Sequence, residues 1–250
     1  LGIVTKAVLS LGPPAGEVVT ALVGVGSTGD ATRLLARLRA AARGGLIAFE
    51  AMWTEFRTTA ERYGTKPFPI DPACEVAVLI ELDMAECPAD PETLLTHLYE
   101  EGLVLDAVLA KSGAEREALW ELRESIYEFG KKMPKGPIFD ISIPTGALVR
   151  AVEMFREQIP RLASDVEWVL FGHLGDSNLH LRIGSHDEAK IAELSKACVY
   201  AITEELDGSI SAEHGIGTEK RAALHHTRSK EEIAVMRAIK AALDPRGILN

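Results

Sequence analysis

The sequence predicts an α+β fold: ferredoxin-like split βαβ units forming an antiparallel sheet covered by helices, with C-terminal helices. Three observations support this class. Residues 17–109 contain two strand–helix–strand patterns in succession, without a repeat at the level of residues. Residues 166–183 contain two apolar β-type runs separated by a glycine-bounded turn. The segments 186–206 and 230–243 have the apolar spacing of helices.

Glycine and proline punctuate the first half of the chain, so its elements can be placed in order. An apolar β-type run at 3–11 ends at Gly12-Pro13-Pro14. Beyond it, we predict strands at 17–25, 46–50, 75–82 and 103–109, and helices at 30–43, 52–63 and 91–101. Asp30 precedes leucines at helical spacing, so we expect it to be the N-cap of the first helix.

The second half begins with a predicted helix at 115–129 and a basic loop at 130–137, which contains Lys131, Lys132 and Lys135. A strand at 138–143 places Asp140 and Ser142 on one face. A turn at Pro144-Thr145-Gly146 then leads into a helix that ends near Gln158.

Composition restricts the class of protein. The chain has 250 residues, of which 47% are hydrophobic, and a formal net charge of −10. Its basic residues are dispersed, which argues against a nucleic-acid partner. Apolar runs stay shorter than the ~20 residues of a membrane-spanning helix. Three widely spaced cysteines indicate a reducing compartment. We therefore expect a cytoplasmic protein, and leave peripheral membrane contact and a homo-oligomer open.

Two short motifs concentrate the chemistry. Residues 172–180 read Gly-His-Leu-Gly-Asp-Ser-Asn-Leu-His, and residues 211–217 read Ser-Ala-Glu-His-Gly-Ile-Gly. His173, His180 and Glu213 can supply two imidazoles and a carboxylate, the ligand set of an open catalytic metal site. His214 is then free to move a proton.

The spacing of the two histidines requires a hairpin. His173 and His180 are seven residues apart, so on one continuous strand they would lie on opposite faces. The intervening glycines and turn-forming residues make a helix unsuitable. A hairpin with its turn at Gly175-Asp176-Ser177 brings the two histidines together. Asp176 either orients a histidine or holds the turn.

Adjacent Glu213 and His214 would point apart in regular β structure, but Gly215 and Gly217 allow an irregular backbone. We expect Glu213 to face the metal and His214 to face the substrate.

Each histidine taken alone is better explained as a structural residue, and we assign His97, His186, His225 and His226 that role. The motifs by themselves are compatible with a metal-dependent hydrolase, although an HExxH signature is absent, and with a non-catalytic structural or assembly domain that holds a structural metal.

The two motifs, together with Leu-Asp-Pro-Arg-Gly-Ile-Leu-Asn at 243–250, resemble the C-terminal domain of the FAD-linked oxidase family. This family contains D-lactate dehydrogenase, the glycolate oxidase FAD subunit and D-2-hydroxyglutarate dehydrogenase. The resemblance implies that residues 1–14 are the tail of an otherwise absent FAD-binding domain. Residues 15–206 would be the substrate-binding cap, and residues 207–250 a segment that packs back on the FAD-binding domain.

The resemblance also implies roles for individual residues. His173, His180 and Glu213 match ligands of a divalent metal, with zinc expected, and His214 matches the base. Substrate contacts are implied for Arg123, Asn178 and His214, and FAD contacts for Ile3, Thr5 and Asn250. The implied reaction is flavin-dependent oxidation of a D-2-hydroxy acid to a 2-oxo acid, with an unknown electron acceptor. This chain alone is expected to be inactive.

The chain departs from the family pattern at three positions. Ser177 stands where glycine is common. Tyr127 and Ile138 stand where the hydroxyglutarate enzymes place a threonine and a lysine that bind substrate. A second substrate carboxylate would then need Lys131, Lys132 or Lys135.

Overall fold

A computed structural model describes residues 4–9, 11 and 16–248. The strands are β1 (Val18–Val25), β2 (Leu46–Trp53), β3 (Val76–Asp83), β4 (Asp106–Leu109), β5 (Ile138–Ser142), β6 (Glu167–His173) and β7 (Asn178–Gly184). The α-helices are α1 (Thr28–Ala42), α2 (Thr54–Arg62), α3 (Pro91–Glu100), α4 (Gly113–Glu124), α5 (Ile126–Phe129), α6 (Leu148–Gln158), α7 (Glu188–Glu205) and α8 (Lys230–Leu243). The 3-10 helices are η1 (Thr145–Ala147), η2 (Ile159–Arg161), η3 (Leu174–Asp176) and η4 (Arg221–His226).

The strands form one seven-stranded sheet in the order β4-β1-β3-β2-β6-β7-β5, and every neighbouring pair is antiparallel. The order β4-β1-β3-β2 is that of a split βαβ unit, so the predicted fold class is confirmed. The second half repeats the pattern as β5-α6-β6-β7-α7. An antiparallel bridge from Ser142 to Ser209 stands where a fourth strand would lie.

The two halves join edge to edge through β2 and β6. In this junction Glu50 pairs with His173, Ala51 with Gly172 and Met52 with Phe171. The pairing places a glutamate of the first half directly beside the first histidine of the second half. The candidate site therefore draws on both halves of the sheet.

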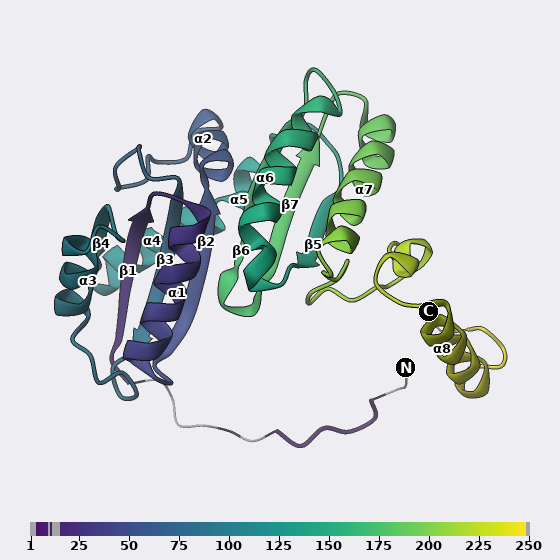
Figure 1. Cartoon of the computed structure of the whole chain (residues 1–250), viewed down its shortest axis with the longest axis horizontal. Coiled ribbons are helices and arrows are strands. Elements are labelled where there is room, and N and C mark those ends of the chain that lie inside the picture. Colours follow the sequence, from purple (N-terminus) through teal and green to yellow (C-terminus); the bar gives the residue numbers. More distant parts are fainter. Residues whose placement is uncertain (1–3, 10, 12–15, 249–250) are drawn as a thin grey trace.

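Helices cover both faces of the sheet (Figure 1). One face packs against α1, α3, α6 and α7 through the larger apolar core. The other packs against α2, α4 and α5 around Phe56, Phe129 and Phe171. Strand residues alternate between the two cores, so Glu50, Asp140, His173 and His180 lie on the same face as the second core.

Several predicted boundaries are wrong. The N-cap of α1 is Ser27, whose side chain accepts a hydrogen bond from the backbone N–H of Asp30. Strand β2 continues to Trp53, because its last residues are buried between both cores. The predicted helix at 115–129 is divided at Ser125.

Two of the predicted strands also differ. The strand predicted from Leu103 begins at Asp106 instead. The described residues of the 3–11 run, 4–9 and 11, are exposed and belong to no helix or strand.

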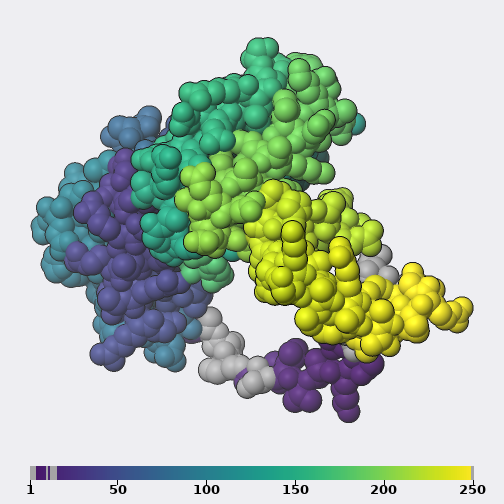
Figure 2. Space-filling view, turned by 45° about the vertical axis from the view of Figure 1, so that its right-hand side comes forward, coloured from purple at the N-terminus to yellow at the C-terminus, as the bar shows by residue number. Residues whose placement is uncertain are grey.

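The C-terminal helix α8 stands apart from the sheet (Figures 1 and 2). Helix α8 has no buried residue and packs on η4, while Val235, Ile239 and Leu243 are exposed. The predicted packing of 207–250 on a FAD-binding domain stays a prediction. Among the described residues, no helix is long and apolar enough to cross a membrane.

Candidate active site

The predicted hairpin brings the two motif histidines together. Strands β6 and β7 pair with Phe171 opposite His180, and η3 with Ser177 makes the turn. The rings of His173 and His180 lie 5.2 Å apart at their centroids and are perpendicular. Because the chain turns back between His173 and His180, both imidazoles lie together at the mouth of the hairpin.

The backbone of this hairpin tolerates few side chains. A Cβ atom added at Gly172 would lie 2.2 Å from the backbone oxygen of Asn178, so only glycine fits there. Ser177 adopts the left-handed conformation, with φ 58° and ψ 23°. Glycine adopts this conformation without the steric cost that a serine carries.

Asp140 holds the second motif against the sheet. Its carboxylate accepts hydrogen bonds from the backbone N–H groups of Ala212, Glu213 and His214 at 2.9–3.3 Å. Lys220 donates to the backbone oxygen of Asp140 at 3.0 Å and lies 3.4 Å from its carboxylate. Three successive N–H groups directed at one anion form a backbone nest, which turns the loop so that neighbouring side chains face the sheet.

The charge of Asp140 is stabilised by these contacts. Burial opposes ionisation, but the backbone N–H groups of the loop and the Lys220 ammonium outweigh it. The pKa of this carboxyl therefore lies below its usual value. Its charge is then available to anchor the loop near neutral pH.

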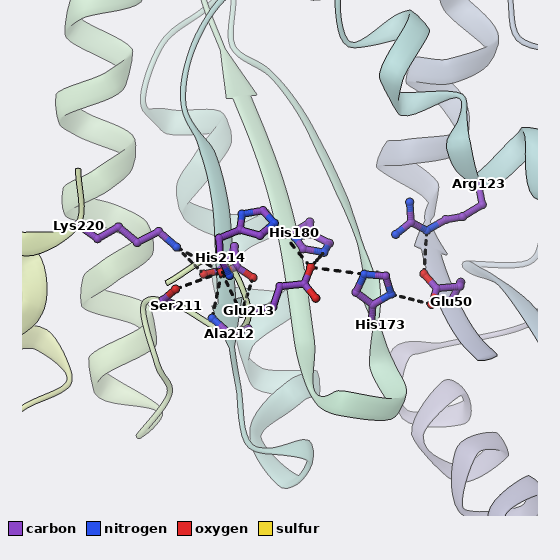
Figure 3. Close-up of polar contacts among 10 residues, drawn as sticks. Glu50, Arg123, His173, His180, Ser211, Ala212, Glu213, His214 and Lys220 are labelled. Atoms are coloured by element: carbon purple, nitrogen blue, oxygen red, sulfur yellow. Dashed lines mark hydrogen bonds and ion pairs between the residues drawn. The ribbon is translucent and has the colours of Figure 1, made fainter. Parts of the chain in front are cut away.

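Glu213 lies at the centre of three imidazoles (Figure 3). Its Oε1 atom is 3.7 Å from Nε2 of His173, 3.5 Å from Nε2 of His180 and 3.6 Å from Nε2 of His214. The rings of His180 and His214 are stacked, with centroids 5.6 Å apart. The irregular backbone continues at Gly215 and Gly217, which have positive φ angles as expected.

This arrangement fits a metal ion. Ligand atoms about 2 Å from a tetrahedral zinc lie roughly 3.3 Å from one another, close to the N···O distances found here. A group of potential ligand atoms that all lie within 4.8 Å of one another comprises Asp140, His180, Glu213 and His214. This group includes the predicted base His214 and does not include the predicted ligand His173. Because the Asp140 carboxylate is already engaged by the loop and Lys220, we regard it as the support of the cluster.

The protonation of the two hairpin histidines differs. Burial, and then the positive charges of His173 and Arg123, lower the pKa of His180 to about 4. Its imidazole is therefore neutral at physiological pH, as a metal ligand must be. A hydrogen bond to Glu50 raises the pKa of His173. The same bond fixes which nitrogen of His173 faces the site.

A buried chain of charges supports His173. Nδ1 of His173 lies 2.7 Å from Oε1 of Glu50, and Oε2 of Glu50 accepts a hydrogen bond of 2.9 Å from Nε of Arg123. Glu50 and Arg123 are both buried, and the Arg123 guanidinium stacks 4.7 Å above the ring of Phe171. A carboxylate on the second nitrogen of a ligating histidine is typical of metal sites.

A cavity of about 520 Å³ opens beside the cluster. His173, His180, Glu213 and His214 lie on its wall. The rest of the lining includes Arg123, Tyr127, Lys131, Ile138, Phe171 and Arg182. A larger groove between the 209–218 loop, η4 and α8 shares only Glu213 with the cluster. A groove of about 610 Å³ beside Arg39 contains His173 and Glu213 but neither His180 nor His214. The 520 Å³ cavity is lined by all three histidines and Glu213, so it is the candidate substrate site.

The remaining predicted residues are dispersed. Asn178 is buried on the same face of β7 as His180, and its Oδ1 has no hydrogen-bond partner in the described structure. Thr5 is exposed, whereas Ile3 and Asn250 lie outside the described residues. Asp176 is exposed in the turn, so Glu50 is the carboxylate that orients His173.

Sequence reasoning missed four polar residues that shape the site: Glu50, Asp140 as an anchor, Arg182 and Lys220. Glu50, Asp140 and Arg182 each sit inside a strand whose neighbours are apolar. A charged residue at such a position is itself a signal, because burial of an uncompensated charge is costly.

Asp140→Asn is expected to lower the free energy of unfolding by about 1.5–3 kcal/mol, the range for hydrogen bonds to a charged group. The amide lacks the charge that attracts Lys220 and the loop N–H groups. Denaturant unfolding and hydrogen exchange at residues 212–214 measure the effect. Asp176→Asn, at an exposed turn position, is the matched control. Unchanged exchange protection in the Asp140 variant would contradict the anchoring role.

Arg123→Met is expected to cost about 3–5 kcal/mol, because it leaves the Glu50 carboxylate buried without its cation. The double variant Glu50→Gln/Arg123→Met should lose less than the sum of the two single variants. Denaturant unfolding of the complete cycle gives the coupling energy. Arg37→Met, which removes an exposed pair with Glu101, should leave the free energy of unfolding close to that of wild type, because solvent screens exposed ion pairs. Strict additivity in the cycle would show that the buried pair is not coupled.

Comparison with known proteins identifies the family. Residues 15–250 match the model of "FAD linked oxidases, C-terminal domain". The chain belongs to this family. A D-2-hydroxyglutarate dehydrogenase of Stutzerimonas stutzeri (strain A1501) is 34% identical over 213 residues, which cover 82% of this chain and 46% of that protein. A D-2-hydroxyglutarate dehydrogenase of Xanthomonas citri pv. viticola is 34% identical over 262 residues, which cover 100% of this chain and 54% of that protein.

A solved structure shares the fold of this FAD-linked oxidase domain. It is p-cresol methylhydroxylase with substrate bound, with a TM-score of 0.63, 12% identity, and coverage of 95% of this chain and 52% of that chain. The domain spans about half the length of the relatives it matches.

Proposed function

We propose that this domain binds and orients a D-2-hydroxy acid for oxidation to a 2-oxo acid by FAD held in the rest of the protein. The observation that carries the proposal is the convergence of three imidazoles on the Glu213 carboxylate at the wall of a cavity. The D-2-hydroxyglutarate dehydrogenases among its relatives support the same reaction class.

We assign His173, His180 and Glu213 as the ligands of a divalent metal, with zinc expected. The neutral state of His180 and the orientation of His173 by Glu50 support this assignment. Such an ion supplies Lewis acidity, which makes the substrate hydroxyl easier to deprotonate. The ligands leave room on the cavity side, as a catalytic rather than a structural site requires.

His214 is the residue that takes the proton from the C2 hydroxyl. Its side chain is 56% exposed and lies on the cavity wall, while its backbone N–H is held at 2.9 Å by Asp140. The backbone is thus fixed, and the imidazole is accessible to substrate, which is the geometry that a general base needs. FAD, when bound, supplies the acceptor for the hydride from C2.

Arg123 and Asn178 stay proposed substrate contacts. Arg123 reaches the cavity, although its Nε is engaged by Glu50. The unpartnered Oδ1 of Asn178 marks an acceptor available on the site face of β7. The proposed packing of 207–250 on the FAD-binding domain is supported by the exposed apolar residues of α8.

The test uses the full-length protein. Flavin bleaching is followed with a panel of D- and L-2-hydroxy acids, with and without chelator. We expect bleaching by D-isomers only, its loss on chelation and its recovery with added zinc. Ester hydrolysis without flavin involvement would favour the hydrolase class. Unfolding on chelation, without any metal requirement in folded protein, would favour a structural metal.

A further inference from the structure

Arg182 is a cation for whose side chain no hydrogen bond or ion pair is found within the described part of the chain. Its Nε is buried and has no hydrogen-bond partner. None of the ion pairs found among the described residues includes it. Unsatisfied buried donors are rare because each costs free energy. An arginine kept in this state, at the wall of a cavity, indicates an anionic ligand.

Arg182 is directed to the same side of the sheet as the metal cluster. It follows His180 by two positions in β7, so both side chains leave the same face. Its cross-strand neighbours are Ile138 in β5 and Val169 in β6. Neither neighbour offers a hydrogen-bond acceptor in its side chain. The N–H donors of the guanidinium, which have no hydrogen-bond partner among the described residues, are therefore available to a ligand.

The other cations at this cavity are already engaged. Arg123 donates its Nε to Glu50, and Lys131 donates to Glu128 at 2.8 Å. Lys132 donates to the backbone oxygen of Tyr63, and Lys135 does not line the cavity. Of the lysines predicted to meet a second substrate carboxylate, Lys131 lines the cavity and is paired with Glu128, whereas Lys132 and Lys135 do not line it. Arg182 lines the cavity without an ion-pair partner among the described residues.

We propose that Arg182 binds a second carboxylate of the substrate and so determines specificity for 2-hydroxy dicarboxylic acids. The inference rests on the proposed function, which places the reacting end of the substrate at Glu213 and His214. Two residues along a strand separate Arg182 from His180 by roughly 7 Å, the scale of a short dicarboxylic acid. A guanidinium binds a carboxylate through two parallel hydrogen bonds.

The test compares two substrates of equal chain length in the full-length flavoprotein. D-2-hydroxyglutarate carries the second carboxylate, and D-2-hydroxypentanoate lacks it. In Arg182→Met, we expect KM for D-2-hydroxyglutarate to rise about 10–100-fold, the value of one charge-assisted interaction. The kcat for this substrate and the KM for D-2-hydroxypentanoate should change less than about 3-fold, and Arg182→Lys should restore part of the affinity.

Arg150→Met is the matched control, since it makes the same chemical change at an exposed position of α6 that does not line the cavity, and it should leave both KM values near wild type. An equal rise in KM for both substrates would overturn the proposal, because Arg182 would then act on the reacting end or on the site as a whole. Unchanged KM for D-2-hydroxyglutarate would overturn it as well.

Binding without turnover separates this inference from the proposed reaction. Isothermal titration with 2-oxoglutarate should show binding to wild type and a loss of about 10–100-fold in Arg182→Met. If no 2-hydroxy acid bleaches the flavin but this difference in binding is found, the proposed reaction fails and the role of Arg182 stands. If both proteins bind 2-oxoglutarate equally, the role of Arg182 is wrong.

Discussion

Replacing His214 with alanine in the full-length protein is expected to slow flavin reduction by D-2-hydroxy acids by about 10²–10⁴-fold, the usual contribution of a general base. The imidazole of His214 borders the cavity. The backbone N–H of His214 donates a hydrogen bond to the Asp140 carboxylate, which holds the residue in place. Because we assign the metal to His173, His180 and Glu213, metal content and FAD content should stay at wild-type levels. Stopped-flow bleaching of the flavin measures the rate.

His97→Ala is the matched control for this experiment. His97 is an exposed histidine on α3, on the face of the sheet away from the site. Its replacement should leave the rate unchanged. Flavin reduction at the wild-type rate in His214→Ala, with metal and FAD bound, would show that another group takes the proton.

Glu213→Ala is expected to remove the metal and to lower the rate of flavin reduction by at least about 10³-fold, since Lewis-acid stabilisation is worth several kcal/mol. All three imidazoles converge on the Glu213 carboxylate. Its removal leaves the proposed ligand set with two neutral imidazoles and no anion. Elemental analysis of the purified protein and single-turnover kinetics test the two effects together.

Glu219→Ala provides the comparison, because Glu219 is exposed on the same segment and lies outside the cluster. Full metal occupancy in Glu213→Ala would exclude Glu213 as an essential ligand. Loss of metal with an unchanged rate would instead assign the ion a structural role. The His214 and Glu213 variants therefore separate the base from the metal.

The local sequence determined the parts of the site that depend on neighbours along the chain. The seven-residue spacing of His173 and His180, with turn residues between them, is compatible with a hairpin and with little else. The βαβ pattern of the first half likewise determined the strand order β4-β1-β3-β2. These predictions succeeded because periodicity and turn chemistry act over short distances.

Tertiary structure alone decided which distant residues complete the site. Glu50 reaches His173 only because β2 pairs with β6, and Asp140 reaches the 211–214 loop from a strand more than 70 residues earlier. Only the folded structure shows that Arg123 and Lys131 have carboxylate partners while Nε of Arg182 has none among the described residues. Strand register and the pairing of charges arise from packing of the whole sheet, and no local pattern encodes them. The two motifs thus predicted which residues would carry the chemistry, and the junction between the two halves of the sheet decided which residues surround them.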